Sequence, residues 1–263
     1  MSGWQEVHNA ELSDTLRGGE KSCALAVMIK SPRAGAVKTR LVPPLTSEEA
    51  AALSLCFLRD TLKNVASVAR RTGARGVVMY TPEKDRPFFH ELLPDDFYLL
   101  PQRGSSLGER LLNATTDLLH RGFDAVCLIG ADSPTLPPAT LVAAINLLAL
   151  SGDQRVVLGP CEDGGYYLIG LKRQHSQLFI GIEWSTERVL SQTLARAEEI
   201  GVGVELLPAW YDVDDARALR RLRDELFAKT ERGELRSDKS FAAYEAAHAR
   251  EYLALLFERE DRL

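Results

Sequence analysis

The chain has 263 residues, of which 26% are charged, and its 32 Lys and Arg residues against 37 Asp and Glu residues give a net charge of −5. This length suits one α/β domain with a sizeable core, and the acidic balance argues against a nucleic-acid-binding protein with a broad basic surface. No apolar run approaches the roughly 20 residues that a membrane helix needs, so we expect a cytoplasmic protein without a membrane or nucleic-acid partner.

The first elements of the chain are marked by clear local patterns. Residues 1–22 are polar and lack the apolar core of a signal peptide, which predicts a flexible leader. The apolar run 23–29 predicts a buried strand. Thr46 and Glu49 form a capping box that begins a helix, and Gly73 ends that helix.

The rest of the chain alternates between short apolar runs and helical patterns. Strands are predicted at 76–80, 97–101, 125–130, 155–160, 166–171 and 202–207. Helices are predicted at 106–122, 138–150, 185–200 and 215–228, with a broken helical stretch near Pro87. This alternation predicts one α/β domain over residues 23–228, with a doubly wound, mainly parallel sheet covered by helices on both faces.

The last part of the chain has a different composition. Residues 229–263 are predicted to form a charged linker and a C-terminal helix. The helix is expected over 241–257, because apolar and aromatic residues recur there on one helical face. That face would consist of Phe241, Tyr244, His248, Tyr252 and Leu255.

Four polar loops lie where predicted strands end or begin. In open α/β sheets, ligands bind beyond the carboxyl ends of the strands. We therefore expect these loops to meet at one edge of the sheet and to form a site there. Their sequences are IKSPRAGAVKTRL (29–41), GADSP (130–134), CEDGGY (161–166) and PAWYDVDD (208–215).

The loop after the first strand gathers four cations in an acidic chain, namely Lys30, Arg33, Lys38 and Arg40. Pro and Gly let its backbone turn sharply, Arg suits bidentate phosphate contacts, and Lys provides a mobile point charge. It is not a Walker loop, because GxxxxGK[ST] is absent. We interpret it as a nucleotide phosphate site with Lys38 as the catalytic cation and Arg33 and Arg40 in support. The alternative is a solvated surface loop.

Aspartates after the later strands are candidate metal ligands. Asp132 follows the buried strand 125–130, and a carboxylate there suits Mg²⁺ or Mn²⁺ carried by a nucleotide diphosphate or triphosphate. Asp212 or Asp214 is expected to complete the coordination, with Asp212 favoured, while Asp215 caps the next helix. The alternative for each aspartate is a turn or a helix N-cap, which is a common use of this residue.

The motif EDGGYY offers a candidate acceptor site. Gly164 and Gly165 would let a ligand approach the backbone, and Asp163 could bind an acceptor hydroxyl or assist its deprotonation. We therefore predict Asp163 as catalytic and acceptor-binding, together with both glycines and Tyr166. The alternative is a plain hairpin turn that begins with Asp.

The loop GSSLGERL, residues 104–111, precedes a predicted helix. Free backbone N–H groups at a helix start can bind a base, a ribose or a phosphate. Gly104, Ser106 and Arg110 are therefore predicted to bind the nucleotide. The alternative is simple capping of the helix by Ser105 or Ser106.

The remaining chemistry-bearing residues exclude other enzyme classes. The five histidines form no HxxxH or HExxH pattern, and no GxSxG motif is present. The four cysteines are scattered without a CxxC pair, which indicates reduced thiols. A zinc hydrolase and a Ser-His hydrolase are therefore disfavoured.

With these motifs in place, the chain resembles a bacterial transferase family with the glycosyltransferase-A fold, known as the selenodomain-associated transferase type. The similarity runs from about residue 23 to residue 226 and rests on six ordered motifs: IKSPRAGAVKTRL, GSSLGERL, IGADSP, GPCEDGGYYLIGL, EWST and DVDDARAL. More distantly, AVKTRL is similar to the phosphate-binding loop of phospholactate guanylyltransferase. The D-V-D segment looks like the one that closes the metal site in molybdenum-cofactor nucleotidyltransferases.

This resemblance implies a GT-A-like fold of the nucleotide-diphospho-sugar transferase type. It also implies a nucleoside triphosphate held by the first loop and a divalent metal on Asp132. The last motif reads Asp-Asp-Ala at 214–216 where relatives usually have Thr-Pro-Glu, so only Asp212 and Asp214 carry over.

Three functions compete on these grounds. The first is a metal-dependent nucleotidyltransferase that uses a nucleoside triphosphate, joins its nucleoside monophosphate to a small phosphorylated acceptor and releases pyrophosphate. The second is a glycosyltransferase with a nucleotide-sugar donor, and the third is a non-catalytic nucleotide sensor. Four loop cations favour the first, and Ala131-Asp132-Ser133 lacks the D-x-D pair of many glycosyltransferases. The nucleobase, the acceptor and the oligomeric state stay open.

Overall fold

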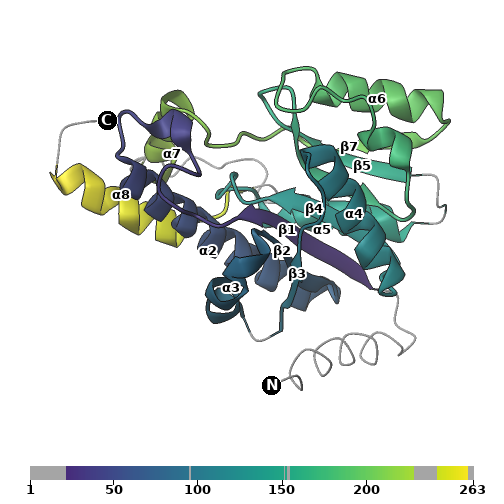
Figure 1. Cartoon of the computed structure of the whole chain (residues 1–263), viewed down its shortest axis with the longest axis horizontal. Coiled ribbons are helices and arrows are strands. Elements are labelled where there is room, and N and C mark those ends of the chain that lie inside the picture. Colours follow the sequence, from purple (N-terminus) through teal and green to yellow (C-terminus); the bar gives the residue numbers. More distant parts are fainter. Residues whose placement is uncertain (1–21, 95, 151, 153–154, 228–241, 260–263) are drawn as a thin grey trace.

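A central β-sheet organises the computed structural model, which describes residues 22–94, 96–150, 152, 155–227 and 242–259 (Figure 1). The strands of this part of the chain are β1 (Cys23–Lys30), β2 (Arg75–Thr81), β3 (Tyr98–Pro101), β4 (Ala125–Gly130), β5 (Arg155–Pro160), β6 (Tyr166–Leu171) and β7 (Gly203–Leu206). Their order in the sheet is β3-β2-β1-β4-β6-β5-β7. All neighbours pair in parallel except β6, which is antiparallel to β4 and β5. The predicted mainly parallel sheet is confirmed.

Helices cover both faces of this sheet, as predicted. The described helices are α2 (Ser47–Thr72), α3 (Arg86–Leu92), α4 (Leu107–His120), α5 (Pro138–Ala149), α6 (Val189–Glu199), α7 (Ala216–Phe227) and α8 (Ala247–Arg259), with the 3₁₀ turns η1 (Thr39–Leu41), η2 (Glu83–Asp85) and η3 (Ser176–Phe179). Side chains alternate along β1, so Leu25 and Val27 pack with α2 and α5, whereas Ala24 and Ala26 pack with α4 and α6. The apolar strands are thus buried on both faces, as in doubly wound sheets.

The capping box predicted for α2 is present. The Thr46 hydroxyl accepts a hydrogen bond from the Glu49 backbone N–H at 3.2 Å, and the Glu49 carboxylate accepts one from the Thr46 N–H at 2.8 Å. Gly73 ends the helix with φ 75°, a left-handed conformation that glycine adopts without steric cost.

The C-terminal helix differs from the prediction. It begins at Ala247, and the preceding described residues 242–246 have no regular secondary structure. Tyr244 therefore lies outside the helix, and its N–H donates to the Thr135 carbonyl at 3.0 Å. Leu255, a residue of the predicted apolar and aromatic face, is 49% exposed, whereas Ala249 and Leu253, which were not assigned to that face, are buried. Residues 1–21 of the predicted leader and residues 228–241, which include the predicted charged linker and Phe241, lie outside the described residues.

A third apolar cluster attaches α8 to the domain. It joins η1, the first turns of α2, α7 and α8 around buried residues such as Phe57, Leu219 and Leu253. Asp60, a fully buried residue of α2, reinforces this contact. Its carboxylate accepts hydrogen bonds from the backbone N–H groups of His248 at 2.9 Å and Ala249 at 2.8 Å. It therefore caps the N-terminus of α8 from another helix.

Replacing Asp60 by alanine is expected to lower the free energy of unfolding by roughly 2–4 kcal/mol, because two buried N–H groups lose their acceptor. Urea denaturation measures the loss. Asp215→Ala is the matched control: Asp215 caps α7 by accepting from Ala218 N–H at 2.8 Å but is exposed, so its loss should cost only about 1 kcal/mol. Equal costs would show that α8 is held by apolar contacts alone.

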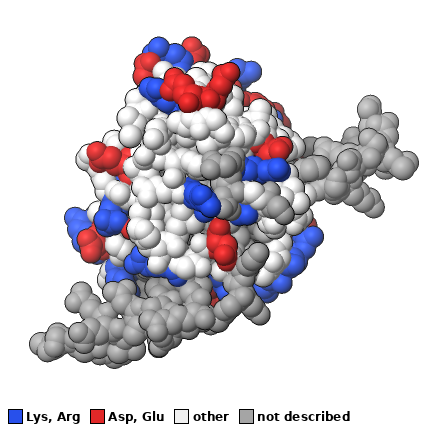
Figure 2. All heavy atoms as spheres, turned by 90° about the vertical axis from the view of Figure 1, so that its right-hand side faces the viewer, with Lys and Arg blue, Asp and Glu red and all other residues white. Residues whose placement is uncertain are grey.

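The surface carries mixed charges on the face where α6 lies. Figure 2 shows basic and acidic side chains interspersed there, with a group of both signs at the top of the view. One such pair on α6 joins Arg196 Nη1 to Glu199 Oε2 at 2.7 Å. In the described ranges, no helix has the length and apolarity that crossing a membrane requires.

Candidate nucleotide and metal site

Three loops meet where the carboxyl ends of β1 and β4 lie side by side. Lys38, from the loop after β1, places its Nζ 2.5 Å from Asp132 Oδ1 and 2.8 Å from Asp214 Oδ1. Asp132 follows β4, and Asp214 lies in the segment before α7. Only 5% of the lysine side chain is exposed, so its ammonium is fixed between the two carboxylates. The predicted meeting of these loops at one sheet edge is confirmed.

The two aspartates keep this buried lysine charged. Burial alone would lower the pKa of Lys38, but the negative charges of Asp132 and Asp214 outweigh it and hold the pKa above its ordinary value. Burial raises the pKa of Asp214, but the positive charges of Lys38 and Arg40 lower it by more, so this pKa lies below its ordinary value. The ion pairs therefore persist across the physiological pH range.

A second acidic group lies at the turn between β5 and β6. It contains Cys161, Asp163 and Asp212, whose candidate ligand atoms lie within 4.8 Å of one another. The Cys161 thiol donates to Asp212 Oδ1 at 3.4 Å. The structure thus groups Asp212 with Asp163 and Cys161, and it pairs Asp132 and Asp214 through Lys38.

Asp212 carries an unfavourable charge in this group. Its burial, followed by repulsion from Asp214 and Asp163, raises its pKa from 3.8 to about 6. Two carboxylate neighbours therefore make the charged form of Asp212 costly unless a cation is bound nearby.

The variant Asp212→Asn is expected to be more stable than the wild type at about pH 8 without divalent ions, with no difference below about pH 4. The pKa of Asp212 is raised in the folded state, so the wild type loses stability when this carboxylate loses its proton, as the pH rises through about 6. Asparagine has no proton to lose at this position, so the variant keeps its stability. Each pKa unit corresponds to at most about 1.4 kcal/mol, which solvent reduces at this half-exposed site. Thermal melts across pH measure the difference, and a destabilised variant at high pH would contradict the prediction.

The four cations of the first loop have different partners. Arg33 pairs with Asp85 in η2, and Lys30 donates to the Ala36 carbonyl at 3.0 Å, which folds the loop on itself. Arg40 lines the cleft, and Lys38 is bound at its acidic end. The structure therefore places Lys38 and Arg40 at the site and Arg33 at a neighbouring contact.

An open cleft of about 560 Å³ connects these groups. Its lining includes four aspartates, Asp132, Asp163, Asp212 and Asp214, together with Glu187, and an apolar wall of Leu107, Leu111, Tyr166, Trp184 and Val189. This volume lies within the range of small-ligand pockets. Leu107 and Leu111 lie in the GSSLGERL motif, Tyr166 was predicted to contact the acceptor, and Trp184 lies in the EWST motif. The sequence did not show that these side chains form one wall.

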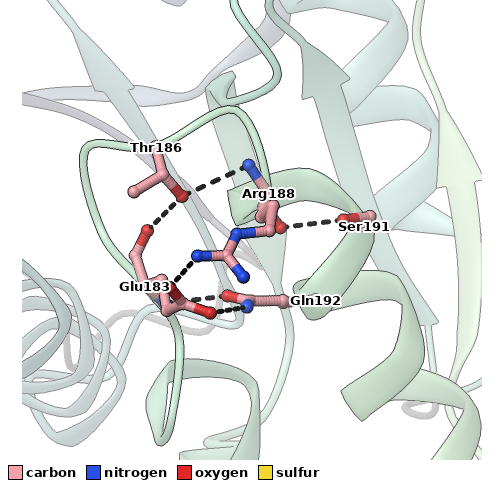
Figure 3. A network of polar contacts seen from close by, with 5 residues as sticks. All are labelled: Glu183, Thr186, Arg188, Ser191 and Gln192. Carbon is pink, nitrogen blue, oxygen red and sulfur yellow. Dashed lines mark hydrogen bonds and ion pairs between the residues drawn. The ribbon is translucent and has the colours of Figure 1, made fainter.

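A loop before α6 supplies Trp184 to this wall. The predicted helix at 185–200 begins only at Val189, because residues 183–188 form a polar network (Figure 3). Glu183 accepts hydrogen bonds from Arg188 and Gln192, and the Thr186 hydroxyl donates to the Glu183 carbonyl at 2.7 Å. The network fixes the backbone around Trp184, whose ring lies edge-on to Tyr166 with centroids 6.3 Å apart.

The Asp163-Gly164-Gly165 turn is a hairpin turn and also lines the cleft. Asp163 Oδ1 accepts from Gly165 N–H at 2.8 Å, and Cys161 N–H donates to the Gly165 carbonyl at 3.0 Å. Gly164 has φ 90°, and a Cβ there would lie 2.2 Å from the Glu187 carbonyl oxygen. Glycine is therefore required for the turn to pack against the loop at 183–188.

The loop at 104–111 is largely occupied by its own contacts. Ser106 caps α4 by accepting from Glu109 N–H at 3.2 Å, and the Arg110 guanidinium donates to the Gly104 carbonyl at 3.1 Å. The capping interpretation is confirmed, and Leu107 and Leu111 are the residues of this segment that line the cleft. The predicted caps at Ser106 and Asp215 both form.

The donor set fits a divalent cation. Carboxylate oxygens are the ligands that Mg²⁺ and Mn²⁺ prefer. In the described part of the chain, the four aspartates at the cleft outnumber the two cations beside them, Lys38 and Arg40. One cation position, between Asp132 and Asp214, coincides with the Lys38 ammonium. The other, among Asp163, Asp212 and Cys161, has ligand atoms at distances that one ion can span.

Comparisons with known proteins agree with this architecture. A family model described as "Uncharacterized protein conserved in bacteria (DUF2064)" matches residues 64–186. A crystal structure of a candidate nucleotide-diphospho-sugar transferase from Desulfovibrio desulfuricans G20 is 28% identical, covers 91% of this chain and 98% of that protein, and has a TM-score of 0.74. No curated protein matches the sequence significantly.

A more distant structure shares the fold alone. A cytidylyltransferase from Leptospira borgpetersenii serovar Hardjo-bovis is 9% identical over 91% of this chain and 95% of that protein, with a TM-score of 0.50. The two similarities have the same α/β architecture in common. The chain therefore has the mixed α/β, GT-A-like fold found in nucleotide-diphospho-sugar transferases and nucleotidyltransferases.

Proposed function

We propose that the protein is a metal-dependent nucleotidyltransferase that uses a nucleoside triphosphate and a small phosphorylated acceptor. One observation carries this proposal: four carboxylates and a buried lysine, from loops up to 176 residues apart, meet around one cleft at the carboxyl edge of the sheet. Ligands bind at this edge in open α/β sheets. The resemblance of the motifs to the selenodomain-associated and guanylyltransferase families supports the same proposal.

The proposed roles follow the two sides of the cleft. Lys38 and Arg40, with Arg33 in support, would face the phosphates, and the segment with Gly104, Ser106 and Arg110 would face the nucleoside. The turn with Asp163, Gly164, Gly165 and Tyr166 would shape the acceptor side. Asp132, Asp212 and Asp214 would hold Mg²⁺ or Mn²⁺, whose bound form supplies positive charge that polarises the phosphoryl oxygens.

The reaction would proceed as an in-line phosphoryl transfer. An oxygen of the acceptor phosphate attacks the α-phosphorus, the bond from that phosphorus to the bridging oxygen breaks, and pyrophosphate leaves with the electron pair. Positioned cations lower the barrier by stabilising charge on the leaving group. Asp163 would orient the attacking oxygen from the opposite side.

A glycosyltransferase with a nucleotide-sugar donor is the second candidate. Two observations favour it: the similar protein from D. desulfuricans is described as a candidate nucleotide-diphospho-sugar transferase, and only two of the four loop cations lie at the cleft. Fewer cations suit a diphosphate better than a triphosphate. In that reaction the bond from the sugar's anomeric carbon to the phosphate oxygen would break.

A binding screen separates the two candidates. Nucleoside triphosphates and nucleotide sugars are compared by thermal shift and calorimetry, each with and without Mg²⁺ or Mn²⁺. We expect metal-dependent binding of a triphosphate, and a ligand at 100 times its dissociation constant should add about 2.7 kcal/mol of stability. Preferential binding of nucleotide sugars would favour the glycosyltransferase, and no binding of either class would contradict both.

A further inference from the structure

We propose that Cys161 is itself a metal ligand, and that Cys161, Asp163 and Asp212 form a mixed sulfur–oxygen site that prefers transition ions such as Co²⁺ and Zn²⁺ over Mg²⁺. This inference rests on the proposed function, because it names the class of ion that the transferase would use. The ion would occupy the second of the two cation positions, beside the one proposed for Mg²⁺ or Mn²⁺ at Asp132 and Asp214, and Asp212 borders both positions.

The spacing of the donor atoms fits one ion. Metal–sulfur bonds are about 2.3 Å long and metal–oxygen bonds about 2.0–2.2 Å. A sulfur and an oxygen bound to the same ion at tetrahedral or right angles therefore lie about 3.0–3.7 Å apart. Cys161 Sγ and Asp212 Oδ1 lie 3.4 Å apart, which is within this range. The carboxylate of Asp163 completes the group within 4.8 Å.

The backbone holds the sulfur in place before any ion binds. The Cys161 N–H donates to the Gly165 carbonyl, and Gly165 N–H in turn donates to Asp163, which closes the turn. Cys161 also forms an isolated bridge with Trp210, two residues before Asp212. Two strand ends therefore fix the sulfur and the carboxylates relative to one another. Because Cys161 lines the cleft and Asp163 is exposed, an ion can enter from the cleft.

The charge distribution leaves this position in need of a cation. Asp132 and Asp214 share the single positive charge of Lys38. Among the described residues, Asp163 and Asp212 form no ion pair with a basic side chain. A divalent ion there would complement two carboxylates without displacing the lysine.

The sulfur decides the class of ion. Thiolate is a soft ligand that suits Zn²⁺ and Co²⁺, whereas Mg²⁺ requires oxygen ligands in octahedral geometry. On binding, the Cys161 S–H bond breaks, its proton leaves to solvent, and the sulfur forms a bond to the ion. The hydrogen bond from the thiol to Asp212 is lost in this exchange, and Asp212 binds the ion instead.

Cobalt titration of the full-length protein without nucleotide tests the proposal. A thiolate ligand produces a sulfur-to-cobalt charge-transfer absorption in the near ultraviolet, which carboxylates do not produce. We expect this band in the wild type, its displacement by Zn²⁺, and its persistence in a large excess of Mg²⁺. Cys161→Ser should lose the band. Its Co²⁺ affinity should fall by at least roughly 10–100-fold, which is the usual effect of losing a residue that only supports a metal ligand.

The matched controls are Cys56→Ser and Cys23→Ser. Cys56 is a half-buried thiol on α2, and Cys23 lies 3.9 Å from the thiol of Cys127, a pair that could bind Co²⁺ on its own. Both controls should keep the band. If Cys161→Ser does not fold, Asp212→Asn is used instead. We expect this variant to bind Co²⁺ more weakly than the wild type and to show the band once it is saturated with Co²⁺.

Two results would overturn the inference: Co²⁺ binding without a charge-transfer band in the wild type, or a band that persists in Cys161→Ser. Nucleotide binding is measured separately by calorimetry. Nucleotide binding without the band would refute the thiol ligand and leave the proposed function intact. A band without nucleotide binding would support the metal site and contradict the transferase.

Discussion

Replacing Asp132 by asparagine is expected to reduce metal-dependent turnover by about 10³-fold or more, because a bound metal supplies several kcal/mol of charge stabilisation and each 1.4 kcal/mol is tenfold in rate. Asparagine keeps the shape of the side chain and removes its charge. The variant loses one of the two carboxylates that fix Lys38, at 2.5 Å in the wild type, and one candidate metal ligand. The side chain is 47% exposed, so we expect the fold to stay intact.

Pyrophosphate release from the bound triphosphate, with water as a slow acceptor, measures this effect without knowledge of the natural acceptor. Calorimetry with Mn²⁺ and circular dichroism accompany it. Asp215→Asn is the matched control, because this exposed aspartate caps α7 and does not line the cleft. A rate close to that of the wild type in Asp132→Asn would refute the role of Asp132.

Lys38→Met is expected to lower turnover by about 10²–10³-fold, which is the usual cost of losing one positioned charge donor. Methionine keeps the apolar stem and removes the ammonium, which in the wild type lies 5.6 Å from the centroid of the Phe57 ring. Asp132 and Asp214 then repel each other without a cation between them, and the variant should lose stability near neutral pH. We therefore expect Mn²⁺ to raise the melting temperature of this variant more than that of the wild type.

The comparison of ligands in Lys38→Met tests the assigned function. A selective loss of triphosphate affinity supports the nucleotidyltransferase, and an equal loss for a nucleotide sugar favours the glycosyltransferase. Lys30→Met is the control, since Lys30 is exposed and donates only to the Ala36 carbonyl within its loop. No loss for either ligand would mean that Lys38 serves only to neutralise its two aspartates.

Most elements of the domain could be predicted because their signals are local. The capping box at Thr46, the stop at Gly73 and the alternating burial of β1 depend on residues a few positions apart, whose periods reflect helix and strand geometry. The C-terminal helix was placed wrongly for the opposite reason. Tyr244 packs against the body through a backbone hydrogen bond to Thr135, so an apolar side chain there did not indicate helix.

The candidate site was predicted in part. The β-α alternation predicts that polar residues after the strands lie at one edge of the sheet, and the loops that carry Lys38, Asp132 and Asp214 do lie at that edge. The alternation did not predict which cations of the first loop reach the site and which contact other residues. Arg33 and Lys38 lie five residues apart in the same loop, and the chain path alone directs one to Asp85 and the other to the site.

The sequence by itself determined which residues are available at the edge of the sheet, namely the aspartates, the Gly-Gly turn and the basic loop. Only the tertiary structure decided which of them touch. It placed Lys38 between two carboxylates, grouped Cys161 with Asp163 and Asp212, and added the loop of Trp184 to the cleft. The physical reason is that periodicity and caps act over a few residues, whereas the partner of a charge depends on distance through space. Asp214 lies 176 positions from Lys38 along the chain and 2.8 Å from it in the fold.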